Sequence, residues 1–206
     1  MPEAQFQTFD IRSYEPRAED AFLVDTNAWY WITYSRGTLP CLPAPLTKQI
    51  EQYARFIKKA LEVGSTIGRC DLTLAELAHR IEETEKKIYE YHSLKQGHIK
   101  LKEYRALPAE RDRVVSELVS AWSQVTKMSE NCSFTLGDEV TKGAMESFKS
   151  YLIGGYDLFH LQAMNQKKLV AILTDDADFS TIPQISIYTC NEAVLRKAQK
   201  SGRLVQ

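Results

Sequence analysis

The sequence lacks closely spaced cysteines, a secretory signal and any stretch long enough to cross a membrane. Its four cysteines, Cys41, Cys70, Cys132 and Cys190, are widely scattered, and no Cys-x-x-Cys pair occurs. This spacing argues against a zinc ribbon and suits reduced thiols in a cytosol. The first twenty residues contain no apolar core of a signal peptide, and no apolar run reaches the roughly 20 residues of a membrane span. We therefore expect a cytoplasmic protein with no membrane contact.

The chain also lacks a strong net charge. A formal net charge of −1 gives no overall attraction to nucleic acid, so any such binding must come from local patches. With 44% hydrophobic and 26% charged residues, the composition is that of an ordinary globular protein. For 206 residues we expect one domain, residues 1–206, in which residues 1–20 form an irregular or loosely packed lead-in.

Short apolar runs alternate with stretches of helical periodicity. Strands are predicted at 21–25, 65–70, 132–136, 169–173 and 185–188, with a glycine weakening the second. Helices are predicted directly after residue 25, at 47–64, from 73 past 89, from 108 through 125, from 138 through 148, at 157–166 and at 192–200. The first and fourth strands are continuously hydrophobic, as buried parallel strands are. The alternation predicts an α/β fold in which helices cover both faces of a parallel sheet, a three-layer α/β/α sandwich.

Carboxylates follow two of these strands. Asp25 ends the first strand, and Asp175, Asp176 and Asp178 follow the strand at 169–173. The carboxyl ends of parallel strands lie beside the binding crevice of an open sheet, so these acids are expected near one place. Carboxylates gathered in this way repel one another unless a divalent cation lies between them, and hard oxygen ligands select Mg²⁺ or Mn²⁺. The alternative is structural, with Asp25 as a turn or capping residue and the later cluster as a solvated turn.

Two further acids begin helices. Thr73-x-x-Glu76 has the pattern of a capping box, which explains the glutamate without any chemistry. In the functional interpretation, Glu76 sits near the carboxyl edge of the sheet and reaches a metal held by Asp25. Asp157 opens a helix, where the helix dipole favours an acid in any case. His160 follows three residues later and lies on the same side, where we expect a packing residue, or one that supports a ligand, rather than a ligand itself.

Taken together, these segments resemble the PIN-domain nuclease family. The matching motifs are Leu23-Val24-Asp25-Thr26-Asn27, Thr73-Leu-Ala-Glu76-Leu, Tyr156-Asp157-Leu-Phe-His160-Leu-Gln-Ala and Leu173-Thr174-Asp175-Asp176-Ala-Asp178-Phe179. The strand at 185–188 and the terminal helix also fall where that family places its last β–α unit. The resemblance covers roughly residues 21–200, and the order and spacing of the motifs are more specific than any one of them.

The resemblance implies a site built from acids with polar support. The implied catalytic residues are Asp25, Glu76, Asp157 and Asp176, and the implied metal ligands are Asp25, Asp157, Asp176 and Asp178. Thr174 and Asn27 are the supporting residues, and His160 matches a histidine that is frequent there but not usually catalytic. The family implies Mg²⁺- or Mn²⁺-dependent cleavage of single-stranded RNA. One or two such ions can neutralise charge on a phosphodiester and help to deprotonate a water.

The chain is longer than the compact VapC-like toxins of bacterial toxin–antitoxin pairs. The long interval between Glu76 and Asp157 implies an enlarged helical segment at about 77–130, and the lead-in is also extra. We therefore expect a PIN-like, metal-dependent endoribonuclease with a helical insertion. A toxin role, an antitoxin partner and a homodimer are further expectations, with Trp31, Tyr34 and Leu39 as candidates for a dimer or antitoxin surface.

A basic stretch rich in aromatic residues is the candidate RNA-binding surface. Residues 86–113 carry more lysines and arginines than acids, interleaved with tyrosines and histidines. Cations for the phosphate backbone and aromatic faces for the bases are what single-stranded nucleic acid requires. Lys95, Lys100, Lys102 and Arg105 are the candidate contacts with single-stranded or structured RNA. The alternative is a solvated helical hairpin.

Three other interpretations use the same residues. A catalytically silent PIN-like scaffold would bind RNA or protein, with acids that hold metal weakly or not at all. Glu76-x-x-His79 and Asp157-x-x-His160 mimic the spacing found in di-iron helical bundles, which the predicted strands contradict. A receiver-like phosphoacceptor at Asp25 would not need the acids at 76 and 157.

Overall fold

A seven-stranded sheet forms the centre of the molecule. The computed structural model describes residues 7–38, 47–93 and 98–205. The strands are β1 (Thr8–Asp10), β2 (Ala21–Val24), β3 (Thr66–Arg69), β4 (Glu130–Asn131), β5 (Ala171–Leu173), β6 (Ser186–Thr189) and β7 (Leu204–Val205), in the order β4-β3-β2-β5-β6-β1-β7. Each pair of neighbouring strands is parallel. The chain adds β3 on one side of β2 and β5 on the other, so the topological switch point lies between β2 and β5.

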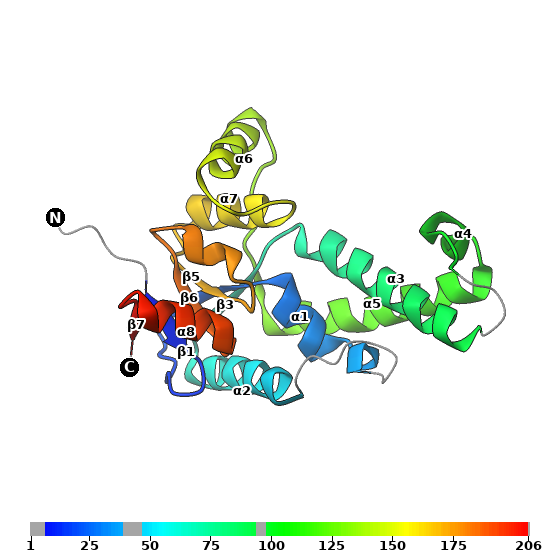
Figure 1. The fold of residues 1–206 in the computed structure, drawn as a ribbon, viewed down its shortest axis with the longest axis horizontal. Helices are drawn as coiled ribbons and strands as arrows, with labels where there is room; N and C mark the ends of the chain where they lie inside the picture. The colour runs from blue at the N-terminus through cyan, green and yellow to red at the C-terminus, as the bar shows by residue number, and fades with distance from the viewer. Residues whose placement is uncertain (1–6, 39–46, 94–97, 206) are drawn as a thin grey trace.

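Helices surround this sheet. They are α1 (Thr26–Thr33), α2 (Thr47–Val63), α3 (Thr73–His92), α4 (Leu101–Arg105), α5 (Pro108–Met128), α6 (Asp138–Ser150), α7 (Asp157–Lys167) and α8 (Glu192–Lys200), with short 3₁₀ helices η1 (Ser35–Thr38) and η2 (Asp178–Thr181). Figure 1 shows α3 and α5 extending side by side away from the sheet, with α4 at their far end. We call these three helices the arm. Within the described residues, no helix combines the length and apolar content that a membrane span requires.

The sheet is covered on both faces because its strand residues alternate in direction. Phe22 and Val24 of β2 belong to a buried cluster with residues of α1, α2, α3 and α5. Leu23, between them, belongs to a second cluster with residues of α7, η2 and α8. The predicted fold class is confirmed as a parallel-sheet, three-layer α/β/α sandwich with a helical insertion. The sheet excludes the all-helical di-iron bundle.

One buried acid joins the three helices of the arm. Glu82 of α3 is 5% exposed and accepts hydrogen bonds of 2.7 and 2.5 Å from Arg105 of α4. Arg111 of α5 lies 3.6 Å from the same carboxylate. The hydrogen bonds from Arg105 lower the pKa of Glu82, because they favour its charged form. The end of the arm is therefore a packed structure, in the interval where the sequence predicts an enlarged helical segment.

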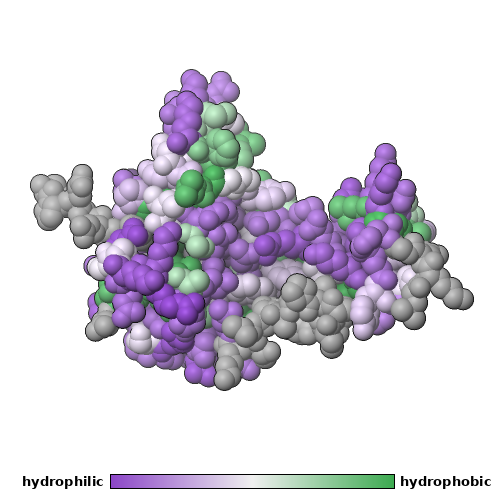
Figure 2. All heavy atoms as spheres, viewed as in Figure 1, coloured by the Kyte–Doolittle hydropathy of each residue, from purple (hydrophilic) through white to green (hydrophobic). Residues whose placement is uncertain are grey.

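Helix α6 presents its larger apolar side chains to solvent. Leu136, Met145, Phe148 and Leu152, on α6 and its flanks, each expose more than half of their surface. Figure 2 shows an apolar side on the projection that α6 forms. The opposite side of the helix packs closely on α7 through small residues, and a Cβ at Gly143 would lie 2.4 Å from the Gln162 side chain. A side chain at this position would therefore displace the end of the Gln162 side chain.

The expectation of an irregular lead-in is wrong for its described part. Residues 8–10 form β1, which pairs with β6 on one side and β7 on the other. Thr8 and Ile11 are buried, and Arg12 bonds Asp10 and Glu192. The segment has no apolar run of its own, so only its pairing with distant strands makes it a strand. Residues 1–6 lie outside the described residues.

The strand predicted at 132–136 is also wrong. The strand in this region is β4, at Glu130–Asn131, and the following residues form a loop. The amide of Phe134 donates to the Asp71 carboxylate, so it is not available for a strand ladder. Cys132 packs over β3, where a Cβ at Gly68 would lie 2.5 Å from the cysteine sulfur. The glycine that weakened the prediction of the β3 strand therefore makes room for Cys132.

Two aromatic residues expected at a partner surface have other surroundings. Tyr34 is 1% exposed in the core, and its hydroxyl donates to buried Glu85 at 2.7 Å. Trp31 is partly buried and packs on the same cluster. Leu39 lies outside the described residues. Tyr34 is thus a core residue and not part of a dimer or antitoxin surface.

Candidate functional site

The first acid of the site lies at the switch point of the sheet. Asp25 follows β2, and its amide donates to the carbonyl of Leu173 at the end of β5, 3.0 Å away. Asp25 is the N-cap residue of α1, but its side chain makes no capping hydrogen bond. The absence of this bond leaves the carboxylate free for other contacts. Asn27 donates to Asp25 Oδ2 at 3.2 Å.

Thr174 connects the acids that follow β2 and β5. Its hydroxyl is fully buried, donates to Asp25 Oδ2 at 2.7 Å and accepts from the amide of Asp176 at 2.9 Å. The single hydroxyl uses both its donor and an acceptor position. The loop that carries Asp176 is thereby held in a fixed relation to Asp25.

We expect Thr174→Val to lower the free energy of unfolding by about 1–3 kcal/mol, because the Asp176 amide and Asp25 Oδ2 each lose a partner inside the protein. Thr174→Ser keeps the hydroxyl and should recover most of this loss. Urea unfolding of the two variants beside the wild type measures the difference. Equal stability of the valine and serine variants would contradict the structural role of the hydroxyl.

Asp25, Asp157 and His160 form one compact group. One ligand atom from each lies within 4.8 Å of the others. His160 Nδ1 is 3.8 Å from Asp157 Oδ1 and 4.0 Å from Asp25 Oδ1. Asp25 is 1% exposed, and its Oδ1 has no hydrogen-bond partner among the described residues. A buried carboxylate oxygen without a partner is costly, so this group fits a divalent cation well.

The pKa shifts in this group follow from burial and charge. Burial raises the pKa of Asp25, and the charge of Asp157 raises it further, while His160 and the Thr174 hydrogen bond lower it. Burial would lower the pKa of His160, but its interactions with Asp157, Cys70 and Asp25 outweigh burial and raise the pKa to about 10. The two aspartates therefore favour positive charge in this group, which a protonated His160 or a bound cation supplies.

Glu76 does not form the predicted capping box. The N-cap of α3 is Leu72, without a side-chain cap, and Thr73 is the first helical residue. Glu76 Oε2 is buried with no hydrogen-bond partner among the described residues, and Oε1 lies 3.6 Å from Arg80. Burial raises the pKa of Glu76, and Asp25 adds to this effect. The capping explanation of this acid is thus excluded, and the charge of Asp25 acts on its carboxylate.

The three aspartates that follow β5 lie in different environments. Asp176 is half-buried, and its pKa is raised by burial and by the charges of Asp178, Asp157 and Asp25. Asp175 accepts from Tyr53 instead, at 3.1 Å. Asp178 is exposed at the start of η2, and its amide donates to Asp176 Oδ1 at 2.8 Å. Within the part of the chain that the structure describes, Glu76, Asp176 and Asp178 lie outside the compact three-residue group.

Three residues near the acids were not assigned to the site from the sequence. His160, expected to be a packing residue, belongs to the compact group, and its spacing from Asp157 was the available signal. Arg80, one helical turn after Glu76, lies 3.6 Å from the Glu76 carboxylate and 5.8 Å from the centre of the Tyr30 ring. Tyr53 contacts the Thr174 carbonyl at 3.0 Å and the Thr189 hydroxyl at 3.0 Å. Nothing local in the sequence indicates this last role.

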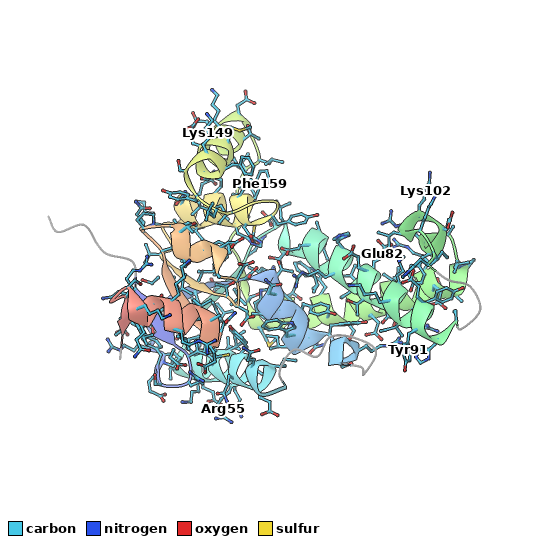
Figure 3. All side chains as sticks on the ribbon, viewed as in Figure 1. Arg55, Glu82, Tyr91, Lys102, Lys149 and Phe159 are labelled. Carbon is cyan, nitrogen blue, oxygen red and sulfur yellow. The ribbon has the colours of Figure 1, made fainter. Side chains whose placement is uncertain are left out.

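The predicted RNA-binding residues lie far from the acids. Lys100 and Lys102 are exposed at the end of the arm, where Lys102 points away from the body (Figure 3). Arg105 is occupied by Glu82 in the arm. Lys95 lies outside the described residues. The structure therefore separates this basic surface from the acidic site by the length of α3.

Comparisons with known proteins find similarity among solved structures and not among sequences. No family model and no curated protein sequence matches the chain. Among solved structures, a chain in the crystal structure of VapBC2 from Rickettsia felis, bound to a DNA fragment from their promoter, is similar with a TM-score of 0.48 and 16% identity. The match covers 82% of this chain and 98% of that chain. Similarity at this level assigns neither a family nor an activity.

Proposed function

We propose that the protein is a PIN-like, metal-dependent endoribonuclease that hydrolyses phosphodiester bonds of single-stranded RNA. The observation that carries the proposal is the buried Asp25 carboxylate, whose free oxygen faces Asp157 and His160 at the switch point of the sheet. Asp25 Oδ2 accepts hydrogen bonds from Thr174 and Asn27, but these contacts do not explain why Oδ1 is buried without a partner. The motif resemblance to PIN-domain nucleases supplies the reaction class.

Each acid has a distinct part in this proposal. Asp25 and Asp157 hold Mg²⁺ or Mn²⁺, and Asp176 is a further ligand kept in place by Thr174. When bound, the cation would stabilise negative charge on the phosphate and lower the pKa of a water. Glu76, with its unpartnered buried oxygen, orients or deprotonates that water. Asp178 and Asn27 support Asp176 and Asp25.

Cleavage of a panel of single-stranded RNAs with Mn²⁺, Mg²⁺ or EDTA tests the proposal. We expect cutting with either metal, none with EDTA, and loss of cutting in Asp176→Asn. Asp138→Asn is the matched control, because Asp138 is an exposed acid at the start of α6. Cutting that persists in Asp176→Asn, or that ignores EDTA, would contradict the assigned site.

A catalytically silent scaffold that binds RNA or protein is the alternative. It predicts metal or RNA binding without any cutting across the panel.

We further propose that the nuclease is a toxin held inactive by a partner protein. Induced expression in a bacterial host should then arrest growth, and the Asp176→Asn variant should not. Growth arrest by both the wild type and Asp176→Asn would contradict the toxin proposal. The nuclease proposal would still be decided by the cleavage assay.

We predict that Lys100→Glu with Lys102→Glu weakens RNA binding without slowing the chemical step. From Glu76 to His92, α3 runs about 24 Å, so these lysines contact RNA well away from the scissile bond. Losing two phosphate contacts should reduce the slope of log affinity against log salt by about 1.4. Fluorescence anisotropy across a salt series measures this, with Lys142→Glu and Lys149→Glu on α6 as the control pair. An unchanged slope would remove the arm from the RNA-binding proposal.

A further inference from the structure

The His160 ring is a buried polar group whose contacts with the two aspartates, at 3.8 and 4.0 Å, are too long for hydrogen bonds. It is 0% exposed, and neither of its ring nitrogens has a hydrogen-bond partner among the described residues. Buried polar atoms in native proteins are nearly always paired, because an unpaired one loses its hydration without compensation. Asp25 Oδ1, 4.0 Å from Nδ1, is unpaired as well. Unpaired atoms from two different elements thus face the same small space.

We propose that His160 is itself a metal ligand, so that the site is a centre of two carboxylates and one imidazole that selects transition-metal ions such as Mn²⁺ over Mg²⁺. This deepens the proposed function, on which it rests for the use of the metal. The family resemblance gives His160 no such role. The geometry supplies it, because Nδ1 lies 3.8 Å and 4.0 Å from the two aspartate oxygens.

These separations suit one shared cation. With metal–ligand distances of about 2.1 Å, ligand atoms on adjacent octahedral positions lie about 3 Å apart, and those on opposite positions about 4.2 Å apart. The observed separations of 3.8 and 4.0 Å fall between these values. Small side-chain rotations therefore bring all three atoms to a single ion.

The donor set determines which ion is preferred. Mg²⁺ favours oxygen ligands and keeps several waters, whereas imidazole nitrogen binds transition-metal ions more strongly. Asp25 and Asp157 alone would accept Mg²⁺ and Mn²⁺ alike as hard oxygen donors. His160 adds one softer donor and shifts the preference toward the transition-metal ion. The expected signature is a Mn²⁺ preference that depends on residue 160.

Pulsed electron paramagnetic resonance of bound Mn²⁺ tests the ligand directly. We expect a nitrogen coupling in the wild type that changes when histidine is labelled with ¹⁵N, a result that needs no substitution in the protein. His160→Gln should lose this coupling, while His79→Gln should keep it, because His79 is half-exposed on α3 and pairs with Glu83. Mn²⁺ bound without a histidine nitrogen coupling would overturn the proposal, as would failure to bind Mn²⁺ at millimolar concentration.

Isothermal titration gives the selectivity. Removing even the partner of a metal ligand costs about 10–100-fold in affinity, so His160→Gln should lose at least that much Mn²⁺ affinity and much less Mg²⁺ affinity. An equal loss for both ions would overturn the proposed selectivity. The outcome is independent of RNA cleavage. Nitrogen coupling without RNA cleavage would support His160 as a metal ligand and reject the nuclease proposal. RNA cleavage without the coupling would support the nuclease proposal and reject His160 as a ligand.

Discussion

Asp25→Asn is expected to reduce metal-dependent RNA cleavage by about 10³-fold while the protein remains folded. A metal ion contributes several kcal/mol to stabilising the charge that develops at a phosphate, and about 1.4 kcal/mol corresponds to a tenfold change in rate. Asparagine has nearly the shape of aspartate, so contacts with Thr174 and Asn27 can persist in part. What is lost is the negative charge at the point where Asp157 and His160 converge.

The same variant should respond to metal and pH differently from the wild type. Burial raises the folded-state pKa of Asp25 above its ordinary value of 3.8. The metal-free wild type therefore loses stability as the pH rises from that value through the raised pKa, because the folded form holds the proton more tightly. Asp25→Asn lacks this loss and should unfold at an equal or higher temperature without metal at neutral pH.

Adding metal should reverse that order. At 100 times its dissociation constant, a bound ion stabilises the folded protein by about 2.7 kcal/mol. Differential scanning calorimetry with EDTA and with Mn²⁺ should show this gain for the wild type and for Asp138→Asn, but not for Asp25→Asn. Stabilisation of Asp25→Asn equal to that of the wild type would place the metal elsewhere. Cleavage at the wild-type rate would exclude Asp25 from the reaction.

The sequence predicts the parts of the fold that carry their own hydrophobic signal. The apolar runs before Asp25 and before Thr174 are long enough to identify β2 and β5, which lie at the centre of the sheet. Because parallel strands align their carboxyl ends, the acids after those strands could be expected to approach each other. The contact from Thr174 to Asp25 agrees with that expectation.

Other features depend on partners that are distant in the sequence. The β1 strand exists because β6 and β7 pair with it, and its three residues contain no periodic apolar signal. The Thr73-x-x-Glu76 pattern suggested a cap, but the helix begins one residue too early for Thr73 to serve as N-cap, because Thr73 is already its first residue. His160 looked like a packing residue because its spacing from Asp157 does not reveal that Asp25 faces the same ring. In each case local chemistry was compatible with two structures, and tertiary packing selected one.

The largest effect on stability is expected at Trp29, one turn after Asp25. Trp29 is fully buried in the cluster between the sheet and helices α1, α2, α3 and α5. Its amide donates to the Asp25 carbonyl at 3.1 Å, and its carbonyl accepts from Thr33 at 2.7 Å. Its indole nitrogen has no hydrogen-bond partner among the described residues. The side chain therefore stabilises the fold through packing and not through a polar contact.

Trp29→Ala should lower the free energy of unfolding by about 3–5 kcal/mol, because it leaves a large cavity in a close-packed core. For a protein of this size, that corresponds to a fall in melting temperature of roughly 10 °C. Trp29→Phe keeps an aromatic ring and removes the unpaired N–H, so its loss should be clearly smaller. Trp31→Ala is the control on the same helix, where the tryptophan is only partly buried. Urea unfolding with unchanged m-values measures all three variants.

The two Trp29 variants also separate packing from site chemistry. Because α1 begins directly after Asp25, a cavity at Trp29 should loosen the first turn of α1 and weaken Mn²⁺ binding even where the fold persists. Trp29→Phe should bind Mn²⁺ nearly as well as the wild type, since the ring still supports that turn. If Trp29→Ala lost stability but kept full Mn²⁺ affinity, the position of Asp25 would be set by Thr174 and the end of β5 alone. A stability loss below that of Trp31→Ala would contradict the placement of Trp29 in the core.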